Sequence, residues 1–183
     1  MEIIKLSPKA VNRAKKVILE GGVVVFPTDT VYGFLADASN KKAVEKIFKI
    51  KKRPRSKFLP IFVKDLKMAK ELAEIDERQE KIQAKYWPGK YTFILKSQIP
   101  NPKSQIYGIN KGTIALRIPK YKPLNDLLEK INRPLAQTSV NISGSPSLNK
   151  IDEIIKVFSN QKNQPDLVVD ADNLPKSKPS AIR

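Results

Sequence analysis

Short apolar runs that alternate with stretches of helical periodicity restrict the fold of this 183-residue chain more than any other feature. The runs are rich in β-branched and aromatic residues and are too short for helices, which predicts buried strands. These runs cover residues 23–28, 59–63, 91–96, 113–119, 134–140 and 166–171. The helical stretches cover residues 7–21, 40–53, 65–75, 76–87, 123–131 and 151–158. The alternation predicts an α/β fold with a largely covered sheet.

No repeat, low-complexity linker or change in composition divides the chain, so we expect residues 1–183 to form a single domain. A hydrophobic content of 40% is enough for one sizeable core at this length. Two helix starts are clear, because Ser7 and Asn40 each precede an amphipathic stretch and are good N-cap residues.

The chain contains neither cysteine nor histidine. Disulfides, thiolate nucleophiles, Ser–His catalysis and His-ligated zinc are therefore excluded. Any chemistry has to use carboxylates, hydroxyls, lysine, arginine, backbone dipoles or a metal that arrives with a substrate, so no protein-bound metal is expected.

The formal net charge is +17 and the isoelectric point is about 10.0. Such a charge favours a polyanionic partner such as RNA, and the alternative is a surface that is simply rich in lysine. We find no signal peptide and no apolar run near the roughly 20 residues that cross a bilayer. We expect a cytoplasmic protein that does not contact membranes.

The apolar run at residues 23–26 ends abruptly in the polar motif PTDTVYG, residues 27–33. Proline, threonine, aspartate and glycine are ordinary turn residues, and a tight turn is the simplest interpretation. The functional alternative is a ligand site, because ligands of open α/β sheets bind where strands end.

A basic motif, KIKKRPRSK at residues 49–57, follows the second helical stretch. A solvated basic helix end would explain it. Alternatively, Pro54 stops the helix so that Lys51, Arg53 and Lys57 converge and hold a triphosphate. The chain has no P-loop motif.

Two further polar signals occur later in the chain, one after a strand and one within a strand. In the motif TSVNISG, Ser139 and Asn141 alternate along an extended segment, so they face the same side and could hydrogen-bond a phosphate or a base. Arg117 is a charge within an apolar strand, and a buried arginine needs an anionic partner. A substrate carboxylate or a structural aspartate would serve.

Together these motifs resemble the YrdC/TsaC family of threonylcarbamoyl-AMP synthases. They occur in the family order with similar spacing: PTDTVYG, KKRP, WPGKYTFIL, LRIP, TSVNISG and KPSAIR. The resemblance covers residues 3–183, and the length is similar to that of the short bacterial single-domain type. It implies a YrdC-like fold, a twisted mixed β-sheet with flanking helices and a concave basic face.

The resemblance implies a nucleotidyltransferase that makes L-threonylcarbamoyladenylate and pyrophosphate from L-threonine, bicarbonate or CO2, and ATP with Mg2+. The product would serve the N6-threonylcarbamoyl modification of adenosine 37 in tRNA. A separate threonylcarbamoyl-transferase complex would receive it. Direct contact with tRNA is an open alternative.

The resemblance also implies site residues. Those expected to bind ATP are Lys51, Arg53, Lys57, Thr113, Ser139 and Asn141, and Lys51 and Arg53 would also be catalytic. Thr30, Arg117 and Ser180 would contact threonine. Phe62 stands where several relatives have a histidine that touches threonine. Many relatives continue beyond the position of Arg183, so the closing C-terminal segment is expected to be either compact or incomplete.

Two other functions fit parts of this pattern. A protein that binds double-stranded RNA or tRNA, or acts in ribosome maturation, would need only the basic face. A carbamoyl-transfer module like that of hydrogenase maturation proteins would belong to a longer, cysteine-containing chain. The ordered motif set favours the synthase.

Overall fold

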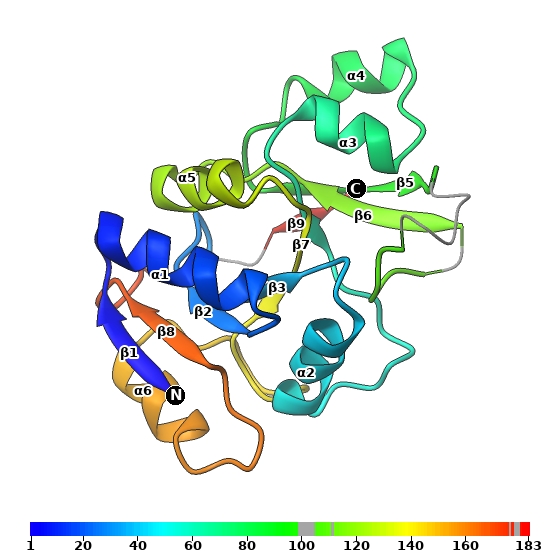
Figure 1. Cartoon of the computed structure of the whole chain (residues 1–183). Coiled ribbons are helices and arrows are strands. Elements are labelled where there is room, and N and C mark those ends of the chain that lie inside the picture. The colour runs from blue at the N-terminus through cyan, green and yellow to red at the C-terminus, as the bar shows by residue number, and fades with distance from the viewer. Residues whose placement is uncertain (99–104, 111, 176, 178–179) are drawn as a thin grey trace.

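One mixed sheet carries the fold in the computed structural model, which describes residues 1–98, 105–110, 112–175, 177 and 180–183 (Figure 1). Among these residues the sheet has nine strands in the order β1-β8-β2-β3-β7-β4-β6-β5-β9. The strands are β1 (Glu2–Lys5), β2 (Val24–Phe26), β3 (Gly33–Asp37), β4 (Ile61–Phe62), β5 (Tyr91–Lys96), β6 (Thr113–Arg117), β7 (Leu135–Ser139), β8 (Leu167–Asp170) and β9 (Ala181–Ile182).

The sheet combines parallel and antiparallel pairs. β8 runs parallel to both β1 and β2, and the pairs β4–β6 and β5–β9 are also parallel. The central pairs β2–β3, β3–β7 and β4–β7 are antiparallel, as is β5–β6. The predicted mixed α/β sheet is confirmed.

Helices cover both faces of this sheet: α1 (Pro8–Leu19), α2 (Lys41–Lys51), α3 (Leu66–Leu72), α4 (Glu77–Gln83), α5 (Lys122–Ile131) and α6 (Ile151–Phe158). The alternation of side chains along the strands creates two separate cores. In β2, Val24 and Phe26 pack with α1 and α5, whereas Val25 packs in the core that includes residues of α2, α3 and α6. Figure 1 shows α1 and α5 as neighbours on the same side of the sheet.

The helix ends follow the caps expected from the sequence. The Ser7 hydroxyl accepts a hydrogen bond from the Ala10 amide at 3.2 Å, and the Asn40 side chain accepts one from Ala43 at 3.2 Å. Helix α2 ends at Lys51 because Lys52 adopts the left-handed conformation, with φ of 51°, two residues before Pro54.

Three strands were not predicted. β3 directly follows the polar motif, is buried on both faces and includes a glycine and an aspartate, so it shows neither alternation nor a β-branched run. β1 and β9 are short edge strands of four and two residues. The helical stretches predicted at residues 65–75 and 76–87 are also shorter in the structure, where α3 ends at Leu72 and α4 ends at Gln83. Within the described residues, no helix is both long and apolar enough to cross a membrane.

Candidate active site

A cavity of about 210 Å³ opens where several polar segments meet. The loop after β2 contributes Thr28 and Thr30, the loop after α2 contributes Arg53, and β6 contributes Arg117. β7 supplies residues 137–139, and the C-terminal segment supplies Ser180 and Ile182. Five of the nine residues predicted for the site therefore line one cavity: Thr30, Arg53, Arg117, Ser139 and Ser180.

The PTDT segment is a tight turn fixed by its own threonines. The Thr28 hydroxyl donates to the Val31 carbonyl at 2.7 Å and accepts from the Thr30 amide at 3.0 Å. The hydroxyl oxygens of Thr28 and Thr30 are 3.0 Å apart, and both residues are buried. The turn interpretation and the ligand-site interpretation are thus compatible, because the turn presents both hydroxyls at the cavity wall.

Arg117 lies at the end of β6 with only 1% of its residue surface exposed. Its Nε donates to the Gly89 carbonyl at 2.9 Å, and its Nη2 donates to the Asp29 carboxylate at 2.5 Å. Burial lowers the pKa of the Arg117 guanidinium, and Asp29 opposes that shift. Of the two anionic partners that the sequence allowed, the structure supplies the structural aspartate.

Lys51 is buried behind β7 rather than at the cavity surface. Its ammonium donates to the Ser139 carbonyl at 2.6 Å, to the Asn141 carbonyl at 3.3 Å and to the Asn141 side-chain oxygen. The Ser139 hydroxyl donates to the same side-chain oxygen at 2.8 Å. Lys51 therefore fixes the positions of Ser139 and Asn141.

The charge of Lys51 is under opposing influences. Burial, followed by the nearby Arg53 cation, lowers the pKa of Lys51 to about 7. Its oxygen acceptors favour the charged ammonium form, since each of them needs a donor. Lys51 is consequently a buried group whose protonation responds to pH near neutrality.

The other two predicted cations are placed differently. Arg53 lines the cavity and donates to the Phe58 carbonyl at 3.1 Å, while its buried Nε finds no hydrogen-bond partner in the described part of the chain. Burial also lowers the pKa of Arg53. Lys57 is exposed and does not line the cavity. The structure thus brings one of the three cations to the surface of the cavity.

Thr113 does not line the cavity. It begins β6 opposite Lys96, four positions before Arg117 in the same strand. At about 3.3 Å per residue, these positions are separated by roughly 13 Å. Its predicted contact with the nucleotide stays a prediction.

The C-terminal segment reaches the cavity as an added strand. β9 pairs with β5 through bonds from Ala181 N to the Lys90 carbonyl at 3.0 Å and from Arg183 N to the Thr92 carbonyl at 2.9 Å. The Ser180 hydroxyl lies 3.0 Å from that of Thr92. Residues 176, 178 and 179 of this predicted closing segment lie outside the described residues.

Sequence reasoning missed Asp29, Gln137 and Ile182. Asp29 stood within the PTDT motif, but nothing in the sequence tied it to Arg117, 88 positions away. Gln137 precedes Ser139 by two positions on β7, so the strand period would have placed both on one face. Ile182 belonged to a two-residue strand with no sequence signal.

Phe62 lies beneath this site. It is fully buried in β4, and the Arg117 guanidinium carbon is 5.4 Å from the centre of its ring. This aromatic face supports the cation of Arg117 in place of a polar contact.

Comparison with known proteins places these residues in a family. The Sua5/YciO/YrdC domain model, which carries the description telomere recombination, matches residues 16–183. The chain belongs to this family. The family assignment made from the motifs is thereby confirmed.

Three curated members of the Sua5/YciO/YrdC family are similar in sequence. A putative threonylcarbamoyl-AMP synthase from Methanocaldococcus jannaschii is 38% identical over 174 residues, or 95% of this chain and 79% of the relative. A threonylcarbamoyl-AMP synthase from Pyrococcus abyssi is 39% identical over 71% of this chain, and one from Bacillus subtilis is 32% identical over 79%. The alignments span only 38% and 42% of those two longer relatives.

Solved structures of known proteins share the fold. P. abyssi Sua5 complexed with L-threonine matches with a TM-score of 0.84 and 30% identity, covering 99% of this chain and 52% of that one. Escherichia coli YciO matches with a TM-score of 0.83 and 25% identity, covering 99% and 86%. Full-length HypF, at 18% identity and a TM-score of 0.79, shows the fold alone.

Proposed function

We propose that this chain is an L-threonylcarbamoyladenylate synthase, a nucleotidyltransferase that uses L-threonine, bicarbonate or CO2, and ATP. The observation that carries the proposal is the convergence of Thr30, Arg53, Arg117, Ser139 and Ser180 on one cavity. Relatives that bear the name threonylcarbamoyl-AMP synthase, and the threonine complex of P. abyssi Sua5, support it.

The amino acid would occupy the part of the cavity between the PTDT turn and β6. The hydrogen bonds of Arg117 to described residues use Nε and Nη2, which leaves Nη1 for the threonine carboxylate. Thr30 and Ser180, which are far apart in the sequence, both line this cavity, and their hydroxyls could hydrogen-bond the amino acid. Such positioning can supply roughly 7–11 kcal/mol of the barrier in favourable cases.

The reaction needs little side-chain acid–base chemistry. The threonine nitrogen attacks the carbon of CO2, an N–C bond forms, and one proton passes to solvent, leaving a carbamate. A carbamate oxygen then bonds to the α-phosphorus of ATP as the bond to the β-phosphate oxygen breaks. Pyrophosphate leaves with that electron pair. A site without histidine or cysteine can carry out these steps by alignment and charge stabilisation.

The nucleotide would lie along the side of the cavity formed by β7 and the loop after α2. Arg53 is the cation at that surface, and Ser139 presents a hydroxyl that Lys51 and Asn141 hold in place. We propose that Lys51 acts mainly as a positioning residue for this segment. Lys57 and Thr113 would reach the nucleotide only through contacts outside the cavity.

Mg2+ enters this proposal as part of the ATP substrate. Within the described ranges, no group of three or more aspartates or glutamates could hold a metal ion. Asp29 is the carboxylate near the cavity, and it is engaged by Arg117. We therefore propose that the ion is held by the triphosphate.

The product would pass to a separate threonylcarbamoyl-transferase complex for modification of tRNA. We also keep the prediction of a concave basic face, with direct tRNA contact as an open alternative; the net charge of +17 is compatible with both.

The deciding experiment measures pyrophosphate release by the purified chain from ATP. We expect release to require both L-threonine and bicarbonate, and to fall when L-serine replaces threonine. Pyrophosphate release that does not depend on threonine, or no release at all, would reject the synthase proposal. It would favour the alternative of a protein that binds double-stranded RNA.

A further inference from the structure

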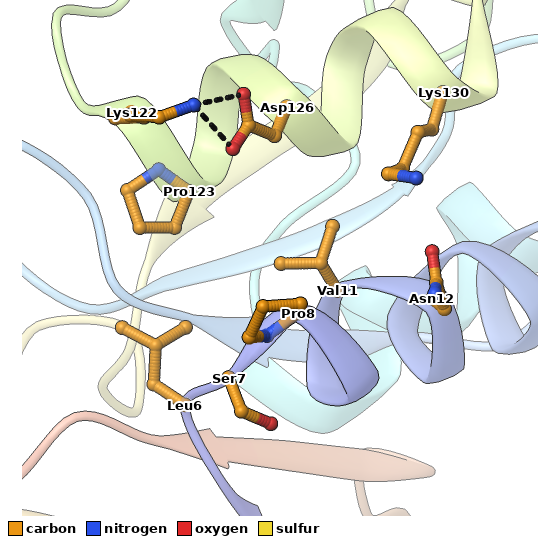
Figure 2. Close-up of a pocket in the computed structure, with 9 residues that line it drawn as sticks. All are labelled: Leu6, Ser7, Pro8, Val11, Asn12, Lys122, Pro123, Asp126 and Lys130. Carbon is orange, nitrogen blue, oxygen red and sulfur yellow. Dashed lines mark hydrogen bonds and ion pairs between the residues drawn. The ribbon is translucent and has the colours of Figure 1, made fainter.

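A groove separate from the candidate active site runs between helices α1 and α5. Its first hollow, of about 340 Å³, has a largely apolar wall formed by Leu6, Pro8, Val11 and Pro123 (Figure 2). A second, shallow hollow of about 480 Å³ lies along α1 as far as Glu20 and shares Asn12 with the first, but its lining residues all belong to α1 and its C-cap. No residue that lines either hollow also lines the cavity of the candidate active site.

The walls of this groove are two helical stripes. Pro8, Asn12, Lys15 and Leu19 follow one another at three- and four-residue intervals on α1, so they share one face of the helix. Residues 122, 126 and 130 form the matching stripe on α5. The 12 residues of α1 span about 18 Å. The first hollow, which both helices line, has a shape that can receive a third helix, and the second hollow would extend that contact along α1 alone.

The rim of the groove has an excess of positive charge. Lys122 on α5 donates to both oxygens of Asp126, at 3.0 and 2.9 Å (Figure 2). On α1, Lys16 lies 4.0 Å from Glu20. Lys15 and Lys130 have no acidic partner within the described part of the chain, so two cations remain for a ligand.

We propose that this groove binds an acidic amphipathic helix of a partner protein. The apolar wall and the partly exposed Leu19 would receive an apolar stripe with i, i+3, i+4 and i+7 spacing. Lys15 and Lys130 would face aspartate or glutamate residues beside that stripe. RNA fits this surface poorly, because the wall of the first hollow is largely apolar.

The test uses a synthetic helical peptide and the full chain. The peptide has about 18 residues, with leucines at i, i+3, i+4 and i+7 spacing flanked by glutamates, and carries a fluorophore. A scrambled peptide of the same composition is the first control. A second control replaces the glutamates with glutamines. We expect the first peptide to bind in the range of about 10 μM and both controls to bind at least about tenfold more weakly.

Variants of the chain then locate the binding surface. Asn12→Trp fills the place where the hollows meet without changing charge, and should abolish binding of the peptide. The double variant Lys15→Glu/Lys130→Glu should weaken it about tenfold. The matched control, Lys67→Glu/Lys81→Glu, makes the same charge change on exposed residues of α3 and α4 and should leave binding unchanged.

Three results would overturn the proposal. The first is no binding of the designed peptide, and the second is equal binding of the scrambled peptide. The third is equal weakening by the two double variants, which would mean that net charge alone attracts the peptide. If a 20-base-pair RNA duplex, about two turns long, loses affinity with Asn12→Trp and the peptide does not, the groove binds nucleic acid instead.

Discussion

The Arg117 guanidinium and the Asp29 carboxylate meet at 2.5 Å, with 1% and 7% of their side chains exposed. The second Asp29 oxygen accepts from the Lys120 amide at 3.1 Å. Asp29 therefore joins the PTDT turn to the loop after β6, and it fixes the guanidinium that would receive the amino-acid carboxylate.

Replacing Asp29 tests this ion pair. Asp29→Ala leaves a buried cation without its partner, which should lower the free energy of unfolding by about 3–5 kcal/mol. Asp29→Asn keeps the shape and should raise the KM for threonine more than it lowers kcat, because it disturbs the alignment of Arg117. Urea unfolding and pyrophosphate release measure these effects. An unchanged unfolding free energy for Asp29→Ala would contradict a structural role for the pair.

The pH dependence of stability tests the burial of Lys51. Its pKa is about 7 in the folded chain and has the ordinary, higher value in the unfolded chain. Between those values the unfolded state binds more protons, so the contribution of this group to stability rises as the pH increases from about 7. We expect Lys51→Met to remove that rise.

Urea unfolding of the wild type and of Lys51→Met at pH 6 and pH 9 provides the measurement. The stability of the wild type relative to the variant should be lowest at pH 6, where Lys51 is charged in both states. The variant should also lose turnover while keeping its fold, since Ser139 and Asn141 lose their common donor. A difference in stability that does not vary with pH would show that Lys51 titrates normally.

Arg53 and Lys57 should differ sharply in their effects on turnover. Arg53 lines the cavity, so Arg53→Ala should reduce kcat by about 10²-fold, as removal of a charge-stabilising donor does elsewhere. Lys57→Ala, on an exposed side chain outside the cavity, should change kcat by less than about threefold. Pyrophosphate release at saturating substrates compares them, with the exposed Arg55→Ala as a control. If Arg53→Ala and Lys57→Ala lower kcat equally, the phosphates must also contact Lys57, outside the cavity.

The pairing of β9 with β5 should control affinity for the amino acid. Ala181→Pro removes the amide that donates to Lys90 and should release Ser180 and Ile182 from the cavity wall. We expect a higher KM for threonine and faster hydrogen exchange at residues 91–94. Arg183→Ala removes only the contacts of Arg183 with the rings of Tyr86 and Tyr91, at 4.5 and 5.0 Å. That smaller loss, about 0.5–1 kcal/mol, should leave KM close to normal.

The sequence was most informative where structure depends on neighbouring residues. The Ser7 and Asn40 caps were predicted because a cap acts within one helical turn. The motifs that gave the family also singled out Thr30 and Arg117, and the structure brings both residues to one cavity.

Pairings across the chain were the part that the sequence could not reveal. The Asp29–Arg117 ion pair joins residues 88 positions apart. The burial of Lys51 was equally hidden, because a lysine at a basic helix end is normally solvated. Its hydrogen-bond partners Ser139 and Asn141 lie 88 and 90 positions away in the chain. Strand β9 was missed because an edge strand of two residues is defined by its partner rather than by its own pattern.

The position of β8 between β1 and β2 has a consequence for how the chain acquires its structure. Glu2 pairs with Leu167, and Leu167 also pairs with Val24. The inner edges of two early strands therefore stay unpaired until a segment more than 140 positions later becomes available. Closing so long a loop carries a large entropic cost before any contact offsets it. Helix α1 can form early, but this half of the sheet should assemble late and in one cooperative step, and its inner strand edges should stay prone to aggregation until then.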